Sequence, residues 1–228
     1  MPFDRSALPD VSHLAVAILG GTGDQGRGLA VRLAIAGQRV LIGSRSAERA
    51  EASAKEISAQ TGARVEGGAN ADVAAQADIV IVAVPYAGHA DTLRELVEPL
   101  RGKIVVDCVN PLGFDKQGPH ALKVEEGSAA QQAEALLPES RVTAAFHHVS
   151  AELLADLGVE RIDLDVLVLG DDREAVAQVQ ALAGRINGVR GVHAGRLRNA
   201  FQIEAFTANL IAINKRYGSH AGIRITDL

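Results

Sequence analysis

Short apolar runs alternate along this 228-residue chain with segments whose apolar residues recur at helical spacing. The runs have the length of buried strands, and the segments between them have the periodicity of amphipathic helices. Expected strands cover residues 14–19, 39–43, 64–66, 78–84, 103–108, 141–145, 165–169 and 189–193. Expected helices cover residues 24–36, 47–60, 72–76, 89–100, 128–137, 151–157, 173–186 and 197–217. This alternation predicts an α/β fold with a Rossmann-type, doubly wound and mostly parallel sheet.

One long segment breaks the alternation. Residues 110–128 contain Gly113, Gly118, Pro111 and Pro119 and show no clear periodicity. We therefore expect a loop, and loops longer than about 12 residues are usually functional or mobile.

The last expected helix, residues 197–217, is apolar on more than one face. Its apolar residues exceed a single stripe: Phe201, Ile203, Phe206, Leu210, Ile211 and Ile213. A helix that is apolar nearly all round is buried. We therefore expect a small C-terminal α/β appendage ending in a long buried helix, which either crosses the domain or forms the interface of a homodimer.

Composition and charge exclude several classes of protein. Hydrophobic residues make up 47% of the chain and aromatic residues 3%, so the core must consist mainly of aliphatic side chains. A net charge of −5 without a basic cluster argues against nucleic-acid binding. The one cysteine, Cys108, lies in an apolar run, so we expect a small buried hydrophobe and neither a disulfide nor a cysteine-rich metal site. No apolar run approaches the roughly 18 residues that span a bilayer, and residues 1–13 lack a signal peptide's apolar region, so a cytoplasmic protein is expected.

A glycine-rich turn, Gly21-Thr22-Gly23-Asp24-Gln25-Gly26, follows the first expected strand. The spacing assigns a tight turn with positive φ to Gly21, close approach to a pyrophosphate to Gly23, and close packing of the next helix to Gly26. That helix directs its free N–H groups at the phosphates. The motif alone is common, but the strand before it and the helix after it supply the required context, so we expect a dinucleotide site.

The second expected strand ends about 20 residues beyond the glycines, where NAD enzymes place a ribose-binding carboxylate. This chain has Gly43-Ser44-Arg45 there, with Arg49 one helical turn later. A hydroxyl and a guanidinium attract a 2′-phosphate, which a carboxylate would repel, and Thr22 adds a hydroxyl from the facing loop. These residues therefore favour NADP(H). The alternative for Arg45 and Arg49 is a solvated helix start paired with nearby glutamates.

Ligands of open α/β sheets lie beyond the carboxyl ends of the strands. Three segments follow strands in that position, and we expect them at the nicotinamide end: Val84-Pro85-Tyr86, Val109-Asn110-Pro111 and His147-His148-Val149.

Taken together, these motifs resemble the NADPH-dependent coenzyme F420 reductase family (8-hydroxy-5-deazaflavin:NADP oxidoreductases). The likeness covers nearly the whole chain beyond the first dozen residues. Its segments are Ile18–Gly23, Gly43–Arg45 with Arg49, Val84-Pro85, Lys103–Val106, Ser128–Ala130, Phe146-His147 and Gly170–Asp172. The resemblance implies direct hydride transfer between NADP(H) and coenzyme F420, with no metal.

The resemblance also implies residue roles. Thr22, Gly23, Asp24 and Gln25 would hold the pyrophosphate, and Ser44, Arg45 and Arg49 the 2′-phosphate. Val84, Val109 and Ala151 would flank the nicotinamide, with His147 and Val149 near the deazaflavin. Pro85 and Asn110 are expected at the same site from their position after the strands, and not from the resemblance. His147 would mainly position the deazaflavin, by donating a hydrogen bond or balancing charge; the alternative is a hydrogen-bonded histidine at a strand end. The chain differs from the family pattern at His148 and Ser150, where Thr and Pro are usual.

The chain divides into a flexible N-terminal extension (1–13), an NADP-binding Rossmann domain (14–150), and a C-terminal part (151–228) expected at the deazaflavin site and a dimer interface. Arg196, Arg198, Lys215 and Arg216 are candidates for the anionic tail of the coenzyme, and His89 is expected to be a helix-start residue. Two alternatives remain open: an imine or carbonyl reductase of the pyrroline-carboxylate reductase type, which needs a larger helical domain, and a non-catalytic NADP(H)-binding redox sensor. A ferric reductase module is a further relative, which normally carries a membrane domain.

Overall fold

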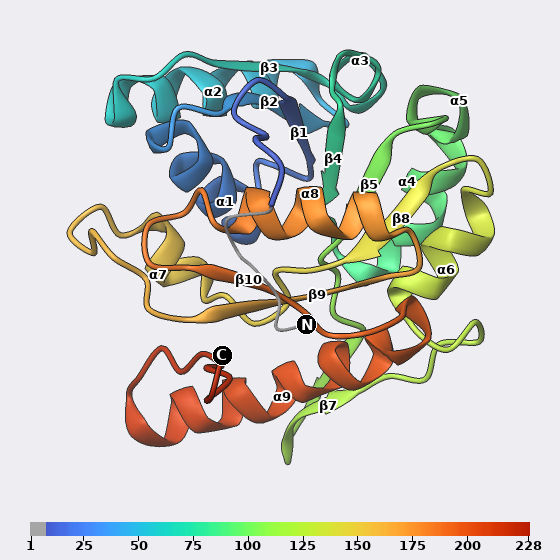
Figure 1. The fold of residues 1–228 in the computed structure, drawn as a ribbon, viewed down its shortest axis with the longest axis vertical. Helices are drawn as coiled ribbons and strands as arrows, with labels where there is room; N and C mark the ends of the chain where they lie inside the picture. Colours follow the sequence, from blue (N-terminus) through green and yellow to red (C-terminus); the bar gives the residue numbers. More distant parts are fainter. Residues whose placement is uncertain (1–7) are drawn as a thin grey trace.

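The apolar runs of the sequence form one eight-stranded sheet in the computed structural model, which describes residues 8–228 (Figure 1). The strands cross the sheet in the order β10-β9-β8-β5-β4-β1-β2-β3, and neighbours are parallel except for the antiparallel pair β8–β9. Their bounds are β1 (Ala15–Leu19), β2 (Arg39–Ser44), β3 (Val65–Ala69), β4 (Ile79–Val82), β5 (Ile104–Asp107), β8 (Arg141–Ala144), β9 (Asp165–Gly170) and β10 (Arg190–His193). The predicted Rossmann-type, mostly parallel sheet is confirmed.

Helices cover both faces of this sheet. They are α1 (Asp24–Ile35), α2 (Ala47–Thr61), α3 (Asn70–Gln76), α4 (His89–Glu95), α5 (Val97–Leu100), α6 (Ala129–Leu136), α7 (Ala151–Ala155), α8 (Arg173–Ala183) and α9 (Ala200–Tyr217). Helices α1, α2 and α8 share one apolar cluster with the sheet, and α3, α4 and α6 share the other. Strands β1 and β4 are therefore buried at every position, as parallel strands between two helical layers must be.

The expected loop at residues 110–128 is wrong in part. It contains a two-stranded antiparallel hairpin, β6 (Leu112–Asp115) and β7 (Gly118–Ala121), which lies beside α9 (Figure 1). Gly118 has φ +116°, a conformation that glycine adopts readily. The strands are short and their ends are exposed, with Phe114 70% exposed, so no alternation marks them in the sequence.

Two expected helices also differ from the structure. The helix predicted over residues 89–100 divides at Leu96 into α4 and α5. Pro99 lacks an N–H for Glu95, and its ring would clash with that carbonyl in a continuous helix. The last helix is preceded by a 3-10 turn at Leu197–Asn199, and it is not buried all round. Its outer face exposes four large apolar side chains: Phe201, Phe206, Ile213 and Tyr217.

The start of the chain is described from residue 8 onward, so residues 1–7 of the predicted flexible extension lie outside the described residues. Val11 is buried, and its carbonyl accepts a hydrogen bond from Gln38 Nε2 at 2.9 Å. Among residues 8–228, no helix combines the length and apolarity needed to cross a membrane.

Candidate active site

Two cavities meet at the start of α1, beyond the carboxyl ends of the parallel strands. The first, which we call the dinucleotide cleft after the ligand that the sequence predicts for it, has a volume of about 700 Å³. It is lined by the glycine turn, the end of β2, the start of α3 and the segment after β4. The second cavity, of about 1100 Å³, is lined by α1, residues 147–152, α9 and residues 218–221. Asp24 and Gln25 line both.

The glycine turn differs in one detail from the prediction. Its positive φ of +73° is at Gly20, and not at Gly21. Position 21 has no room for a side chain, because a Cβ there would lie 2.7 Å from Ile42 Cγ2. A Cβ on Gly26 would lie 2.7 Å from the Gly20 carbonyl oxygen, so the predicted close packing of α1 on the turn is present. Gly23 lines the cleft.

Helix α1 presents an uncapped N-terminus to this cleft. Its N-cap is Gly23, which offers no side chain to the first-turn N–H groups. Thr22 and Asp24 are exposed beside it. Free N–H groups at the start of a 12-residue helix bind anions well.

Ser44, Arg45 and Arg49 all line the same cleft, as their positions after the second strand predict. Ser44 is buried, while both arginines are exposed. Neither arginine forms an ion pair within the described part of the chain, so the predicted alternative of pairing with glutamates is not observed. The guanidinium groups are available to a phosphate.

The segments that follow the strands do not all line the same cavity. Val84 and Pro85 line the dinucleotide cleft, whereas Asn110, Val149 and Ala151 line the second cavity. Val109 is buried and, like Gly21, is not among the lining residues of either cavity.

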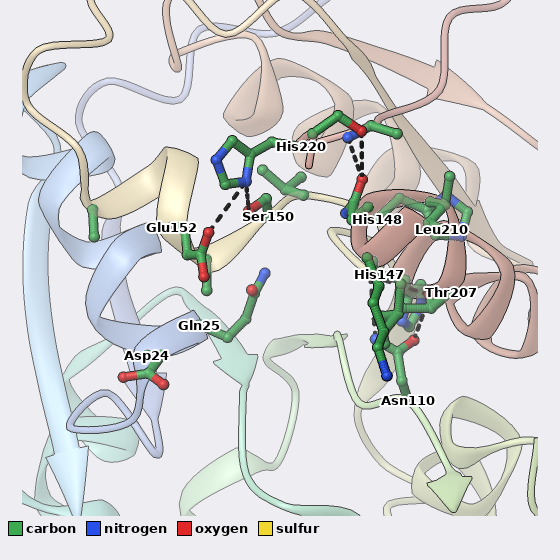
Figure 2. A pocket seen from close by; sticks show the side chains of 18 of the residues that line it. Asp24, Gln25, Asn110, His147, His148, Ser150, Glu152, Thr207, Leu210 and His220 are labelled. Atoms are coloured by element: carbon green, nitrogen blue, oxygen red, sulfur yellow. Dashed lines mark hydrogen bonds and ion pairs between the residues drawn. The ribbon is translucent and has the colours of Figure 1, made fainter. Parts of the chain in front are cut away.

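His147 lies in the wall of the second cavity, opposite Gln25 (Figure 2). It is 5% exposed, and neither ring nitrogen makes a hydrogen bond of good geometry within residues 8–228. Burial lowers the pKa of His147 to about 4, so the ring is neutral at neutral pH. A neutral imidazole carries one donor and one acceptor, and here the described chain satisfies neither.

The backbone around His147 is held from both sides. Asn110 Nδ2 donates to the His147 carbonyl at 3.2 Å, and Thr207 Oγ1 on α9 donates to Asn110 Oδ1 at 3.2 Å. Phe146, just before it, has φ +65°, which is uncommon for a residue other than glycine. Gln25 Nε2 donates to the Phe146 carbonyl at 3.3 Å, which links α1 to this bend.

The C-terminal segment closes one side of the second cavity through residues 218–221. His220 Nδ1 lies 3.3 Å from Glu152 Oε2 and 3.4 Å from Ser150 Oγ (Figure 2). Beyond His220 the chain is anchored on Asp165, whose carboxylate accepts from the Ile225 amide at 2.7 Å and from Arg224 Nη1 at 3.0 Å.

Asp165 itself is fully buried, and Arg190 adds two further hydrogen bonds to its carboxylate. Burial alone would raise the pKa of Asp165, but the hydrogen bonds from Arg190, the Ile225 amide and Arg224 outweigh it and lower the pKa to about 2. This anchor fixes the C-terminal wall of the second cavity.

The four basic residues predicted for an anionic tail are not equivalent. Lys215 lines the second cavity. Arg196 pairs with Asp171 Oδ1 at 3.1 Å, and Arg198 and Arg216 are exposed away from the cavity lining.

Sequence reasoning missed a buried polar network beside the cleft. His89, the first residue of α4 as predicted, places Nε2 2.6 Å from Asp107 Oδ2 and Nδ1 2.9 Å from Gln132 Oε1. Burial would lower the pKa of His89, but Asp107 outweighs it and raises the pKa. The Glu204 carboxylate accepts from the amides of Ala129 and Ala130, and burial raises its pKa to about 7. The sequence did contain a signal for this network, because Asp107 lies in an apolar strand and a buried carboxylate needs a hydrogen-bond partner.

Known proteins are similar to this chain in sequence and in fold over nearly its full length. Residues 15–111 match the family described as "NADP oxidoreductase coenzyme F420-dependent". The F420-dependent NADP reductase of Methanothermobacter thermautotrophicus is 42% identical over 226 residues, which covers 96% of this chain and 97% of that protein. The protein of the same name from Methanocaldococcus jannaschii is 43% identical over 223 residues, 94% of this chain and 99% of its own. A solved structure from Arthrobacter sp. FB24, provisionally described as an F420-dependent NADP reductase, has a TM-score of 0.80 at 30% identity and covers 93% of this chain and 99% of its own. The chain therefore belongs to the family of coenzyme F420-dependent NADP oxidoreductases.

Proposed function

We propose that this protein transfers a hydride directly between NADP(H) and coenzyme F420. The observation that carries the proposal is the meeting of two cavities at Asp24 and Gln25, one with a cationic end and one with a neutral histidine in its wall. The bound nicotinamide and deazaflavin rings supply the redox chemistry, and the protein supplies position and exclusion of water.

The residues of the dinucleotide cleft fit a dinucleotide with a 2′-phosphate. In this proposal the first-turn N–H groups of α1, with Thr22, Gly23, Asp24 and Gln25, hold the pyrophosphate. A carboxylate repels a pyrophosphate, so Asp24 would contribute its backbone N–H and not its side chain. Ser44, Arg45 and Arg49 bind the 2′-phosphate, and Val84 and Pro85 support the nicotinamide half.

The second cavity would hold the deazaflavin. Val149, Ala151 and Asn110 form part of its wall together with His147, whose two ring nitrogens are buried and lack a hydrogen bond of good geometry within residues 8–228. Because His147 is neutral, its proposed role is to donate or accept a hydrogen bond and not to balance charge. Of the four basic residues predicted for the anionic tail, Lys215 is the one that lines this cavity, and we assign the tail to it.

We further infer self-association through the exposed apolar face of α9. Phe201 and Phe206 are 50% and 41% exposed, and Phe114 and Leu122 extend the apolar surface onto the neighbouring hairpin segment. Large apolar side chains exposed on neighbouring elements commonly mark a subunit interface.

Purified protein should be mixed with NADPH and oxidised F420, and the deazaflavin absorbance followed. Bleaching that requires the protein, and that is slower with NADH, is expected. Tight NADP(H) binding with no bleaching would instead favour the redox-sensor alternative, and NADPH oxidation with a cyclic imine alone would favour the imine reductase.

A further inference from the structure

Asn70 lies beside the proposed 2′-phosphate site although it is distant from it in sequence. Strands β2 and β3 pair in parallel, and Ser44 and Ala69 form the last pair of their register. The next residues, Arg45 and Asn70, therefore leave the sheet at the same edge. Both line the dinucleotide cleft.

The side-chain amide of Asn70 has an unusual environment. Its Oδ1 is buried and has no hydrogen-bond partner within the described residues. This oxygen lies 2.7 Å from the position that a Cβ on Gly43 would occupy. Only glycine at position 43 leaves room for it. Asn70 is half-buried and lines the cleft, so we assign the end of the amide on the cleft side to Nδ2. The Nδ2 donor, and not the packed oxygen, is the end of the amide that a ligand can complete, by offering it an acceptor.

We propose that Asn70 is a specificity-determining residue whose amide donates a hydrogen bond to the 2′-phosphate of NADP(H). The inference rests on the proposed binding of NADP(H). Ser44, with its hydroxyl, and Arg45, with its guanidinium, line the same cleft as Asn70, so three residues with donors of different kinds border it. A wall of donors without a carboxylate selects a group rich in acceptors, and a phosphate offers three oxygens.

Binding constants for NADP⁺ and NAD⁺ in the absence of F420 test this assignment, because the two ligands differ only in the 2′-phosphate. Asn70→Asp keeps the shape, removes the donor and adds a negative charge. We expect it to weaken NADP⁺ binding by about ten- to a hundredfold, the effect of a charge-assisted hydrogen bond, and to change NAD⁺ binding by less than about threefold. Asn70→Ser, which keeps a shorter donor and is less disruptive to packing, should weaken NADP⁺ binding by a smaller factor.

Gln76→Ala, an exposed change on the same helix, is the matched control and should alter neither constant. Equal weakening for both dinucleotides in the Asn70 variants would place the amide on the adenine or the ribose and overturn the assignment, as would unchanged NADP⁺ binding. These measurements do not involve hydride transfer, so a failure of the F420 reaction would not be mistaken for a failure of this inference.

Discussion

Replacing Asp165 by Asn should loosen the C-terminal wall of the second cavity without disturbing the dinucleotide cleft. The change keeps the shape of the side chain and removes its charge. Arg190 and Arg224 then lose their common carboxylate, and the Ile225 amide loses an ionised acceptor.

The size of the effect follows from the pKa of Asp165. An aspartate whose pKa falls from 3.8 to about 2 on folding contributes about 2–3 kcal/mol to stability at neutral pH, since each pKa unit corresponds to about 1.4 kcal/mol. The side chain is fully buried, so solvent screening reduces this little. Because the folded pKa is depressed, the contribution is complete above about pH 4 and is lost as pH falls towards 2, with about half remaining at pH 3.

Urea denaturation at pH 7 and pH 3 measures both expectations. Asp165→Asn should lower the unfolding free energy by about 2–3 kcal/mol at pH 7 and by about half as much at pH 3. It should also raise the KM for F420 while the binding of NADP⁺ stays unchanged, because residues 218–221 line only the second cavity.

Asp163→Asn is the matched control. Asp163 also pairs with Arg224, but it is 63% exposed, and an exposed pair contributes at most about 1 kcal/mol. Equal and small losses in the two variants, or a loss for Asp165→Asn that does not shrink at pH 3, would refute the role given to the buried anchor.

Three further predictions concern the two cavities and the exposed helix face. The double variant Arg45→Ala, Arg49→Ala should weaken NADP⁺ binding by roughly 1–3 kcal/mol per lost charged hydrogen bond and leave NAD⁺ binding nearly unchanged, both measured by calorimetry. Equal losses of binding free energy for the two dinucleotides would show that the 2′-phosphate binds elsewhere. His147 is neutral in the folded protein down to a pKa of about 4 but ionises near pH 6.5 when unfolded, so the unfolding free energy should fall as pH drops from about 6.5 to 4. Denaturation of His147→Gln should show a weaker fall over that range, and an unchanged slope would contradict the burial of a neutral ring. Phe206→Glu should reduce the sedimenting mass if α9 forms the subunit contact, whereas an unchanged mass would exclude this face.

Local pattern predicted most of the sheet. Strands such as β1 and β4 are continuous apolar runs because both of their faces are covered, and the glycine turn carries its own spacing constraints. The hairpin β6–β7 was not predicted because its short strands are partly exposed and leave no apolar alternation. Pro99 could have predicted the helix break at Leu96, although the helical spacing of apolar residues continues through this segment.

The parts of the site that escaped prediction depend on contacts between distant segments. His89 and Asp107 are separated by 18 residues and meet only because α4 packs over the end of β5. Asn70 has no distinguishing motif, and its place beside Arg45 follows from the register of two strands. The sharing of Asp24 and Gln25 between two cavities likewise depends on where α9, distant in sequence, forms a wall of the second cavity.

That shared position limits how the enzyme can be altered. Substitutions of Asp24 or Gln25 in the first turn of α1 should change both cavities together, so a gain in binding at one will be tied to a change at the other. Ser44, Arg45 and Arg49 border the dinucleotide cleft alone, and residues 150–152 border the second cavity alone. Efforts to retune the preference for either molecule separately should begin there.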